Sequence, residues 1–167
     1  FDSLVSANTI AKEHAKKFGS LVIQDTGGRM KPANTFSSEL LRKVSKRDHY
    51  GELNADQVMM SIIESPALWY NVPIIYLKRG NDSLRKIIGV HTKQKYASLV
   101  SFFDNKGNYK ISSHLEGAYR AAVPNQFQKD FIEVDKRVNL LYSALKSILS
   151  SHCINIMPNI LPTIPIG

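Results

Sequence analysis

Residues 21–45 read LVIQDTGGRMKPANTFSSELLRKVS and combine the local signals of a β-hairpin and a helix. Residues 21–24 are a β-prone run, residues 25–28 supply a turn whose glycines accept positive φ, and residues 29–31 follow as a short return strand. Pro32 has no N–H, so we expect it to stop the strand pairing. The stretch therefore predicts a small hairpin that ends at a proline.

A helix is expected directly after this hairpin. Asn34 is the expected N-cap, because its side-chain oxygen can accept hydrogen bonds from the free N–H groups of the first turn. The apolar residues behind it recur at helical spacing and share one face: Phe36, Leu40, Leu41 and Val44. Strand, turn, strand and capped helix within one span predict a compact nucleus for the fold.

The same span carries a resemblance to a known family. A strand ending in Gln-Asp, then Gly-Arg-x-Lys-Pro, Asn-Thr and a helix with Leu-Leu-Arg-Lys, resembles the extracytoplasmic domain of system II cytochrome c biogenesis proteins. These are the fused CcsBA-type (ResB-CcsA-type) cytochrome c synthases of Bacteroidetes and similar bacteria. Further segments carry the resemblance, and together they cover most of the chain up to about residue 149: AKEHAKKFG (11–19), LNADQ to WYNVPI (53–74) and VDKRVNLLY (134–142).

The resemblance implies that the intact protein is a polytopic protein of the bacterial inner membrane that delivers haem outward and attaches it to apocytochrome cysteines. The chain would be its periplasmic domain, acting as a scaffold or apocytochrome-guiding module rather than as the catalytic centre. Expected partners are the membrane-embedded remainder of the protein and apocytochrome c. Haem is expected for the intact protein, with no cofactor in this fragment. The family's tryptophan-rich loop is not present in a chain with one Trp, so no catalytic residue is carried over.

Length and composition predict one globular domain over residues 1–150. The chain has 167 residues, of which 43% are hydrophobic and 22% charged, and it has no apolar run of the roughly 18 residues that span a bilayer. Because it begins at Phe1, we expect a piece of a longer protein. Residues 151–167 contain three prolines and are expected to form an extended tail leading toward a membrane segment.

The remaining pattern is mainly helical. A helix is expected over residues 9–18 with Gly19 as its left-handed stop, another from the cap Asn54 to before Pro66, and a third capped by Ser112 or Ser113. Residues 46–51 are expected to be a loop and residues 74–77 a strand. The longest helix follows a stripe of apolar residues at steps of four and three: Phe127, Phe131, Val134, Val138, Leu141, Leu145 and Ile148. The predicted class is α+β and predominantly helical, with a small N-terminal hairpin and a long C-terminal packing helix.

The net charge of +8 favours acidic partners: nucleic acid, anionic lipid head groups or the propionates of a ligand such as haem. The competing interpretation is solubility alone. The cations lie in scattered pairs, and no recognition-helix motif is present, so nucleic acid is not the favoured partner. A basic helical domain that binds nucleic acid or another polyanion is the alternative function.

A search for chemistry in the sequence assigns no catalytic, cofactor-binding or metal-ligating residue. The five histidines have no ligand spacing, Cys153 is single, and neither a phosphate-binding loop nor a nucleophile elbow is present. Arg29, Lys31 and Asn34 are candidate interaction residues, and alternation places Arg29 and Lys31 on one face of the return strand with Met30 on the other. A solvated edge strand is the alternative. Trp69 and Tyr70 are candidates for a docking patch, with a core anchor as the alternative.

Overall fold

The structure of the protein is a computed structural model that describes residue 5, residues 10–24 and residues 28–151. It divides into two compact units, residues 1–71 (unit 1) and residues 72–167 (unit 2), each of which is described by itself. A single domain over residues 1–150 stays a prediction. The extended tail predicted for residues 151–167 lies, from residue 152 on, outside the described residues, as does most of the turn predicted at residues 25–28.

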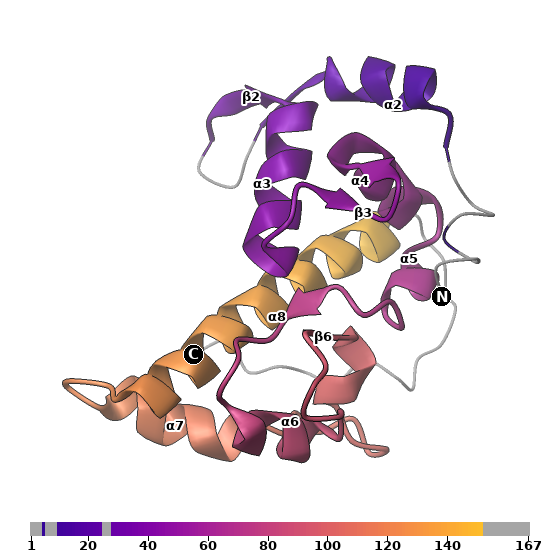
Figure 1. Cartoon of the computed structure of the whole chain (residues 1–167). Helices are drawn as coiled ribbons and strands as arrows, with labels where there is room; N and C mark the ends of the chain where they lie inside the picture. The colour runs from indigo at the N-terminus through magenta and orange to yellow at the C-terminus, as the bar shows by residue number, and fades with distance from the viewer. Residues whose placement is uncertain (1–4, 6–9, 25–27, 152–167) are drawn as a thin grey trace. The chain divides into compact units, whose positions relative to one another are not determined.

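Unit 1 is built from helices and two small hairpins. Helices α2, α3 and α4 pack against one another in pairs, and α5 follows α4 (Figure 1). The apolar stripe predicted on α3 is mostly buried, since Leu40, Leu41 and Val44 are in the core while Phe36 is half-buried. The elements in chain order are α2 (Lys12–Gly19), β1 (Val22–Gln24), β2 (Met30–Pro32), α3 (Ala33–Ser45), β3 (His49–Tyr50), β4 (Leu53–Asn54), α4 (Ala55–Glu64) and α5 (Pro66–Trp69).

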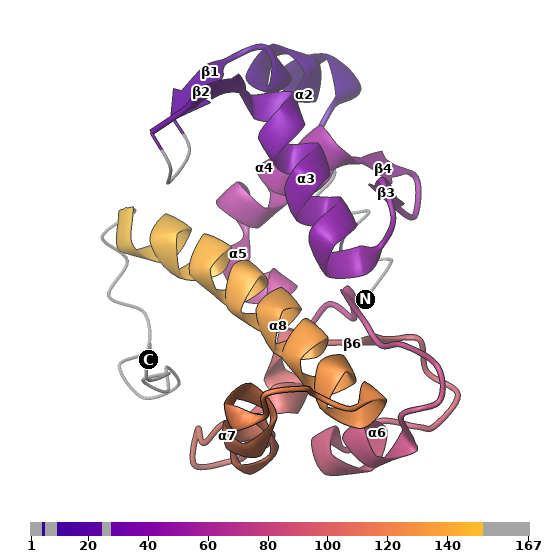
Figure 2. The same cartoon turned by 90° about the vertical axis from the view of Figure 1, so that its left-hand side faces the viewer.

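Unit 2 is organised on its last helix, the long ribbon from orange to yellow in Figure 2. That helix packs against α7, β5 and the 3-10 helix η1. The predicted stripe is confirmed from Phe131 to Leu145, which are fully buried, whereas Phe127 is 41% exposed and the side chain of Ile148 lies outside the described residues. The elements are β5 (Ile75–Tyr76), α6 (Asp82–Ile88), β6 (Tyr96–Ala97), η1 (Leu99–Phe102), α7 (Ser112–Arg120) and α8 (Gln126–Ser151).

The predicted fold class is confirmed: helices dominate, and within the described residues the strands form three separate two-stranded antiparallel sheets, β1–β2, β3–β4 and β5–β6. The β3–β4 hairpin begins inside the segment that was expected to be a loop, residues 46–51. The described helices are either too short or too polar to span a bilayer.

Asparagine starts some of these helices and not others. The prediction for Asn54 is confirmed: its side chain accepts from the backbone N–H of Gln57 at 2.9 Å, and the Gln57 side chain accepts from the Asn54 N–H at 3.2 Å. The prediction for Asn34 is wrong. Helix α3 starts at Ala33, so Pro32 occupies the cap position and makes no side-chain cap, while Asn34 lies within the first turn.

Three other local predictions are corrected by packing. Pro32 does not stop pairing but pairs with Val22 as the last residue of β2, a strand end where a missing N–H is tolerated. Gly19 is the last residue of α2 rather than a left-handed stop, and a Cβ there would lie 2.5 Å from Oδ2 of Asp56, so glycine lets α2 approach α4. Helix α7 follows the buried Ile111 without a side-chain cap, so neither Ser112 nor Ser113 serves as one.

Candidate interaction surface on the hairpin

The β1–β2 hairpin presents two faces of opposite character. In its register Val22 pairs with Pro32, Ile23 with Lys31 and Gln24 with Met30. Because side chains alternate along a strand, Val22, Met30 and Pro32 share one face, and Ile23 and Lys31 share the other. This register confirms the sequence prediction that Lys31 and Met30 lie on opposite faces.

The face that carries Lys31 turns toward the start of α3. The Lys31 Nζ lies 3.0 Å from Oε2 of Glu39 and 6.0 Å from the centre of the Phe36 ring, and the Lys31 side chain is 20% exposed. An ammonium that is held between a carboxylate and a ring in this way fixes the hairpin against the helix. Lys31 is therefore an internal contact of unit 1 rather than a solvated charge on a strand edge.

The other face of the hairpin is exposed, and its side chains are apolar apart from Gln24, which pairs with Met30. Val22 is 62% and Met30 is 65% exposed, and Leu21, the residue before β1, is 55% exposed. Sequence reasoning missed these residues, although the alternation that groups Val22 with Met30 was available. We call Val22, Gln24, Met30 and Pro32 the outer hairpin face.

Three exposed cations lie close to the hairpin in the sequence. Arg29 precedes Met30 and is exposed. Lys16 and Lys17 are exposed in the last turn of α2, whose carbonyl groups accept from the backbone N–H groups of Ser20 and Leu21, so α2 runs straight into the hairpin. Asn34 is exposed, and its Oδ1 accepts from the Thr35 hydroxyl at 3.2 Å.

Trp69 and Tyr70 do not join this surface. Trp69 has no exposed area, donates from Nε1 to the Ser61 hydroxyl at 3.0 Å and meets the Tyr50 ring edge-on at 5.6 Å. Tyr70 is half-buried beside it in the chain. The core-anchor interpretation of Trp69 is confirmed, and an exposed docking patch at Trp69 is wrong, because an indole that fills a core and satisfies its N–H there has no free surface.

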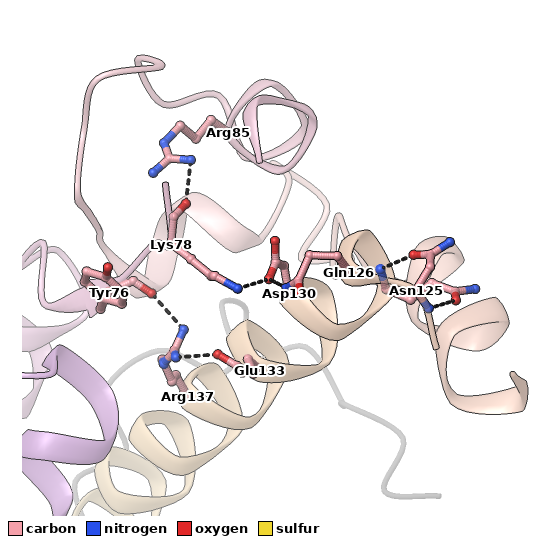
Figure 3. Close-up of polar contacts among 9 residues, drawn as sticks. Tyr76, Lys78, Arg85, Asn125, Gln126, Asp130, Glu133 and Arg137 are labelled. Carbon is pink, nitrogen blue, oxygen red and sulfur yellow. Dashed lines mark hydrogen bonds and ion pairs between the residues drawn. The ribbon is translucent and has the colours of Figure 1, made fainter. Parts of the chain in front are cut away.

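Unit 2 contains a second set of polar residues, which sequence reasoning did not find (Figure 3). Arg85 is 2% exposed and binds backbone carbonyls only: its guanidinium donates to Leu77, Lys78, Asn81 and Gln94 at 3.0–3.3 Å. These carbonyls belong to the two ends of residues 77–94, so one side chain closes the loop that contains α6. No periodic pattern in the sequence predicts that Arg85 is buried in this way.

Two more charged groups from α8 continue this framework. Arg137, 6% exposed, donates to the Tyr76 carbonyl at 3.1 Å and to Glu133 at 2.9 Å, and its guanidinium lies 5.5 Å from the Tyr76 ring centre. Asp130 accepts from Lys78 Nζ at 3.2 Å and from Gln126 at 2.7 Å (Figure 3). These contacts attach β5 and the residues after it to α8.

The third buried charge on α8, Asp135, accepts from two tyrosines. The Tyr109 hydroxyl donates at 3.0 Å and the Tyr119 hydroxyl at 2.8 Å. Burial, with the negative charge of Asp135, raises the pKa of Tyr109 far above its usual value. Burial and the hydrogen bond to Asp135 raise the pKa of Tyr119 to about 12. Both phenols therefore stay neutral and donate hydrogen bonds to Asp135, which suits a structural role better than proton transfer.

Unit 2 also carries most of the net charge, with 13 Lys and Arg against six Asp and Glu, compared with nine against eight in unit 1. Four cations around the Arg85 loop are exposed, and within the described residues none of them makes an ion pair: Arg79, Lys86, Lys93 and Lys95.

Among the described residues no group of three His, Cys, Asp or Glu side chains converges to hold a metal ion.

Comparison with known proteins gives one informative relationship. The chain is 33% identical over 134 residues to Protein NrfI of Wolinella succinogenes, a match that covers 78% of this chain. It spans only 14% of the length of that protein. No family model matches the chain. The similarity to NrfI supports the resemblance to cytochrome c biogenesis proteins at the level of the process.

Proposed function

We propose that this chain is a periplasmic domain of a fused system II cytochrome c synthase, of the kind found in Bacteroidetes, in the bacterial inner membrane. The similarity to NrfI carries the proposal, because 33% identity over 134 residues extends through both units. It is joined by the ordered segments at residues 11–19, 21–45, 53–74 and 134–142, which resemble the same family. Since the chain covers a small part of NrfI, the activity of the intact protein is itself part of the proposal.

Within that protein the chain acts as a scaffold or apocytochrome guide rather than as the catalytic centre. The polar groups that are buried in unit 2 support this role. Arg85 and Arg137 bind backbone carbonyls and Asp135 binds two phenols, so these side chains are occupied in holding the chain together. Haem and apocytochrome c are the expected cofactor and partner of the intact protein. The similarity to NrfI favours this function over binding of nucleic acid.

The test is deletion of residues 10–151 from the full-length protein, followed by haem staining of c-type cytochromes and by co-purification of apocytochrome. We expect less haem-bearing cytochrome at unchanged apocytochrome export, and loss of co-purified apocytochrome. Normal maturation together with no apocytochrome contact in the undeleted protein would contradict the proposal. Val123→Ser in the undeleted protein is the matched control, because Val123 is 86% exposed and its removal leaves the core untouched.

The periplasmic side can be tested separately by labelling. Cys153 is the only cysteine of the chain, so Cys153→Ser with Val123→Cys leaves one thiol at an exposed position within it. A membrane-impermeant maleimide added to intact spheroplasts should then label the chain. Labelling that occurs only after lysis would place the chain on the cytoplasmic side and overturn this part of the proposal.

A further inference from the structure

We propose that the Arg85 loop, residues 77–95, is a docking surface for an acidic segment of another polypeptide. The loop contains six Lys or Arg side chains and one acid, Asp82. Two of the six cations are used within unit 2, since Arg85 binds backbone carbonyls and the Lys78 side chain reaches Asp130 on α8 (Figure 3). The other four, which we call the free cations, are exposed and have no ion-pair partner within the described residues: Arg79, Lys86, Lys93 and Lys95.

The backbone positions of the free cations are brought together by Arg85. Its guanidinium binds the carbonyls of residues 77, 78, 81 and 94, so these backbone positions lie around one side chain, and together they form the Arg85 network. Each free cation is the chain neighbour of a member of this network: Arg79 follows residue 78, Lys86 follows Arg85, and Lys93 and Lys95 flank residue 94. Four charges that are separated in the sequence are therefore gathered at one part of unit 2.

Negative groups are scarce around the free cations. Asp82 lies in the first turn of α6, where the helix dipole stabilises a carboxylate. Asn81 is 5% exposed, and its Nδ2 has no hydrogen-bond partner within the described residues, so acceptors are lacking inside the loop as well. Like charges held close together repel one another, and a partner that brings carboxylates relieves that repulsion. The other acids of unit 2 already accept hydrogen bonds or form ion pairs: Asp104, Glu116, Asp130, Glu133 and Asp135.

The other side chains of the loop favour an acidic polypeptide over other anions. Within the described residues none of the large hydrophobic side chains that are exposed belongs to the loop, so nothing there inserts into a bilayer. The loop has no Phe, Tyr or Trp, and the tyrosines that flank it, Tyr76 and Tyr96, are half-buried, which leaves no such ring to stack on bases. Carboxylates on a flexible chain can reach cations that come from separate segments and pair with them through charge-assisted hydrogen bonds.

The inference rests on the proposed function only in that a guide needs a surface for the polypeptide it receives. It is tested on the 167-residue chain, without cytochrome, by fluorescence anisotropy of a labelled synthetic peptide of alternating glutamate and glycine, with one glutamate for each free cation. We expect saturable binding that added salt weakens, because exposed charges are screened. Arg79→Gln with Lys86→Gln should weaken binding about tenfold, and Lys93→Gln with Lys95→Gln should do the same, since each exposed ion pair contributes a factor of about three.

Matched variants separate this surface from net charge and from folding. Lys106→Gln with Lys136→Gln removes the same charge from exposed positions of unit 2 that are not chain neighbours of the Arg85 network, and should bind like the unchanged chain. Arg79→Lys with Lys86→Arg keeps the charge and should bind within about twofold of it. No binding of the peptide, equal losses in the control and the loop variants, or a loss in one loop pair alone would overturn the inference.

Two further arms test rival partners. The chain is mixed with vesicles that contain phosphatidylglycerol, and with an oligothymidylate that carries the same number of charges as the peptide. Weaker binding to both supports the inference, whereas tighter binding to either, lost in the loop variants, would assign the surface to phosphates and overturn it. Failure of the peptide to bind, beside impaired cytochrome maturation on deletion, would reject this surface and leave the proposed function in place. Binding of the peptide beside normal maturation and no apocytochrome contact would do the opposite.

Discussion

The hairpin of unit 1 leaves Val22 and Met30 more than 60% exposed, while unit 2 buries Arg85, Asp130, Asp135 and Arg137 to 6% exposure or less. Apolar groups in water and charges in a core are both unfavourable by themselves, so each needs a compensating reason. In unit 2 the reason is visible, because every one of these charges has hydrogen-bond partners. In the hairpin no described residue of unit 1 covers Val22 and Met30, which is why that face is the candidate surface.

The buried charges of unit 2 determine the path of the chain, whereas the exposed apolar side chains of the hairpin are available for contact with another molecule. A buried guanidinium that binds four carbonyls has one favourable arrangement, so it fixes the path of the loop. An exposed valine or methionine adds little to the fold, so changing it should alter stability only slightly. The predictions below test this contrast, beginning with the change expected to be largest.

Removing the Arg85 guanidinium should be the most damaging of these changes. In Arg85→Met the carbonyls of Leu77, Lys78, Asn81 and Gln94 lose their donor, and we expect a loss of about 3 kcal/mol or more in the free energy of unfolding. Urea denaturation followed by circular dichroism measures it. Lys86→Met, at the exposed neighbouring position, should change stability by less than about 0.5 kcal/mol. Equal effects of the two variants would remove the contrast between a buried charge and an exposed one.

The tyrosine pair on Asp135 should make the stability of unit 2 sensitive to alkali. Tyr119 has its pKa raised to about 12 from the usual 10.0, and the pKa of Tyr109 is raised further by burial. A phenol whose pKa is higher in the folded state stabilises the fold fully below about pH 10, and this contribution is lost as the pH rises from 10 toward 12. Urea titrations across this range should show the decline, and it should be smaller in Tyr109→Phe with Tyr119→Phe.

At neutral pH the same pair should give a graded result. Tyr109→Phe leaves Asp135 with one phenol donor in a buried site and should cost about 1–2 kcal/mol in unfolding free energy. Tyr119→Phe should cost less, because Tyr119 is 54% exposed and water can replace its hydroxyl. A larger cost for Tyr119→Phe would show that burial does not set the importance of the two hydrogen bonds.

Two asparagines of unit 1 allow a sharper comparison. Asn54→Ala removes a reciprocal capping box and should cost about 1 kcal/mol, measured by urea denaturation with Trp69 fluorescence as the probe of unit 1. Asn34→Ala should cost less than about 0.5 kcal/mol, because Asn34 is not the cap of α3. If the two costs were equal, the start of α3 at Ala33 would be wrong.

These asparagines also show what the sequence could predict. Asn54 is followed three residues later by Gln57, whose side chain returns the hydrogen bond. The same Asn-x-x-Gln pattern occurs at residues 125–128, where the Asn125 and Gln128 side chains accept reciprocally at 2.9 Å, and it starts α8. Asn34 has Ser37 at that position, and Ser37 donates to the Ala33 carbonyl. The sequence signal for a helix start is therefore asparagine followed by glutamine three residues later. Asparagine without that glutamine gave the wrong prediction at Asn34.

Other features could not be read from local pattern. Helical periodicity was sufficient to predict the buried stripe of α8, because burial repeats along the element itself. Arg85 gave no such signal, since its carbonyl partners come together only after residues 77–94 have folded. Alternation in the hairpin correctly separated Lys31 from Met30 but did not say which face turns outward. Glu39 and Phe36 on α3 decide that, by holding Lys31 inward.

The smallest expected change in stability is in the outer hairpin face itself. Val22→Ser with Met30→Ser should alter the free energy of unfolding by less than about 0.5 kcal/mol for each residue, because both side chains are already largely in water in the folded chain. Urea denaturation measures it, and Leu41→Ala, at a position 3% exposed on α3, supplies the contrast, with an expected loss of about 2–5 kcal/mol. A hairpin variant that was as destabilised as Leu41→Ala would mean that Val22 and Met30 belong to the core. Unchanged stability would show that these side chains contribute little to the fold.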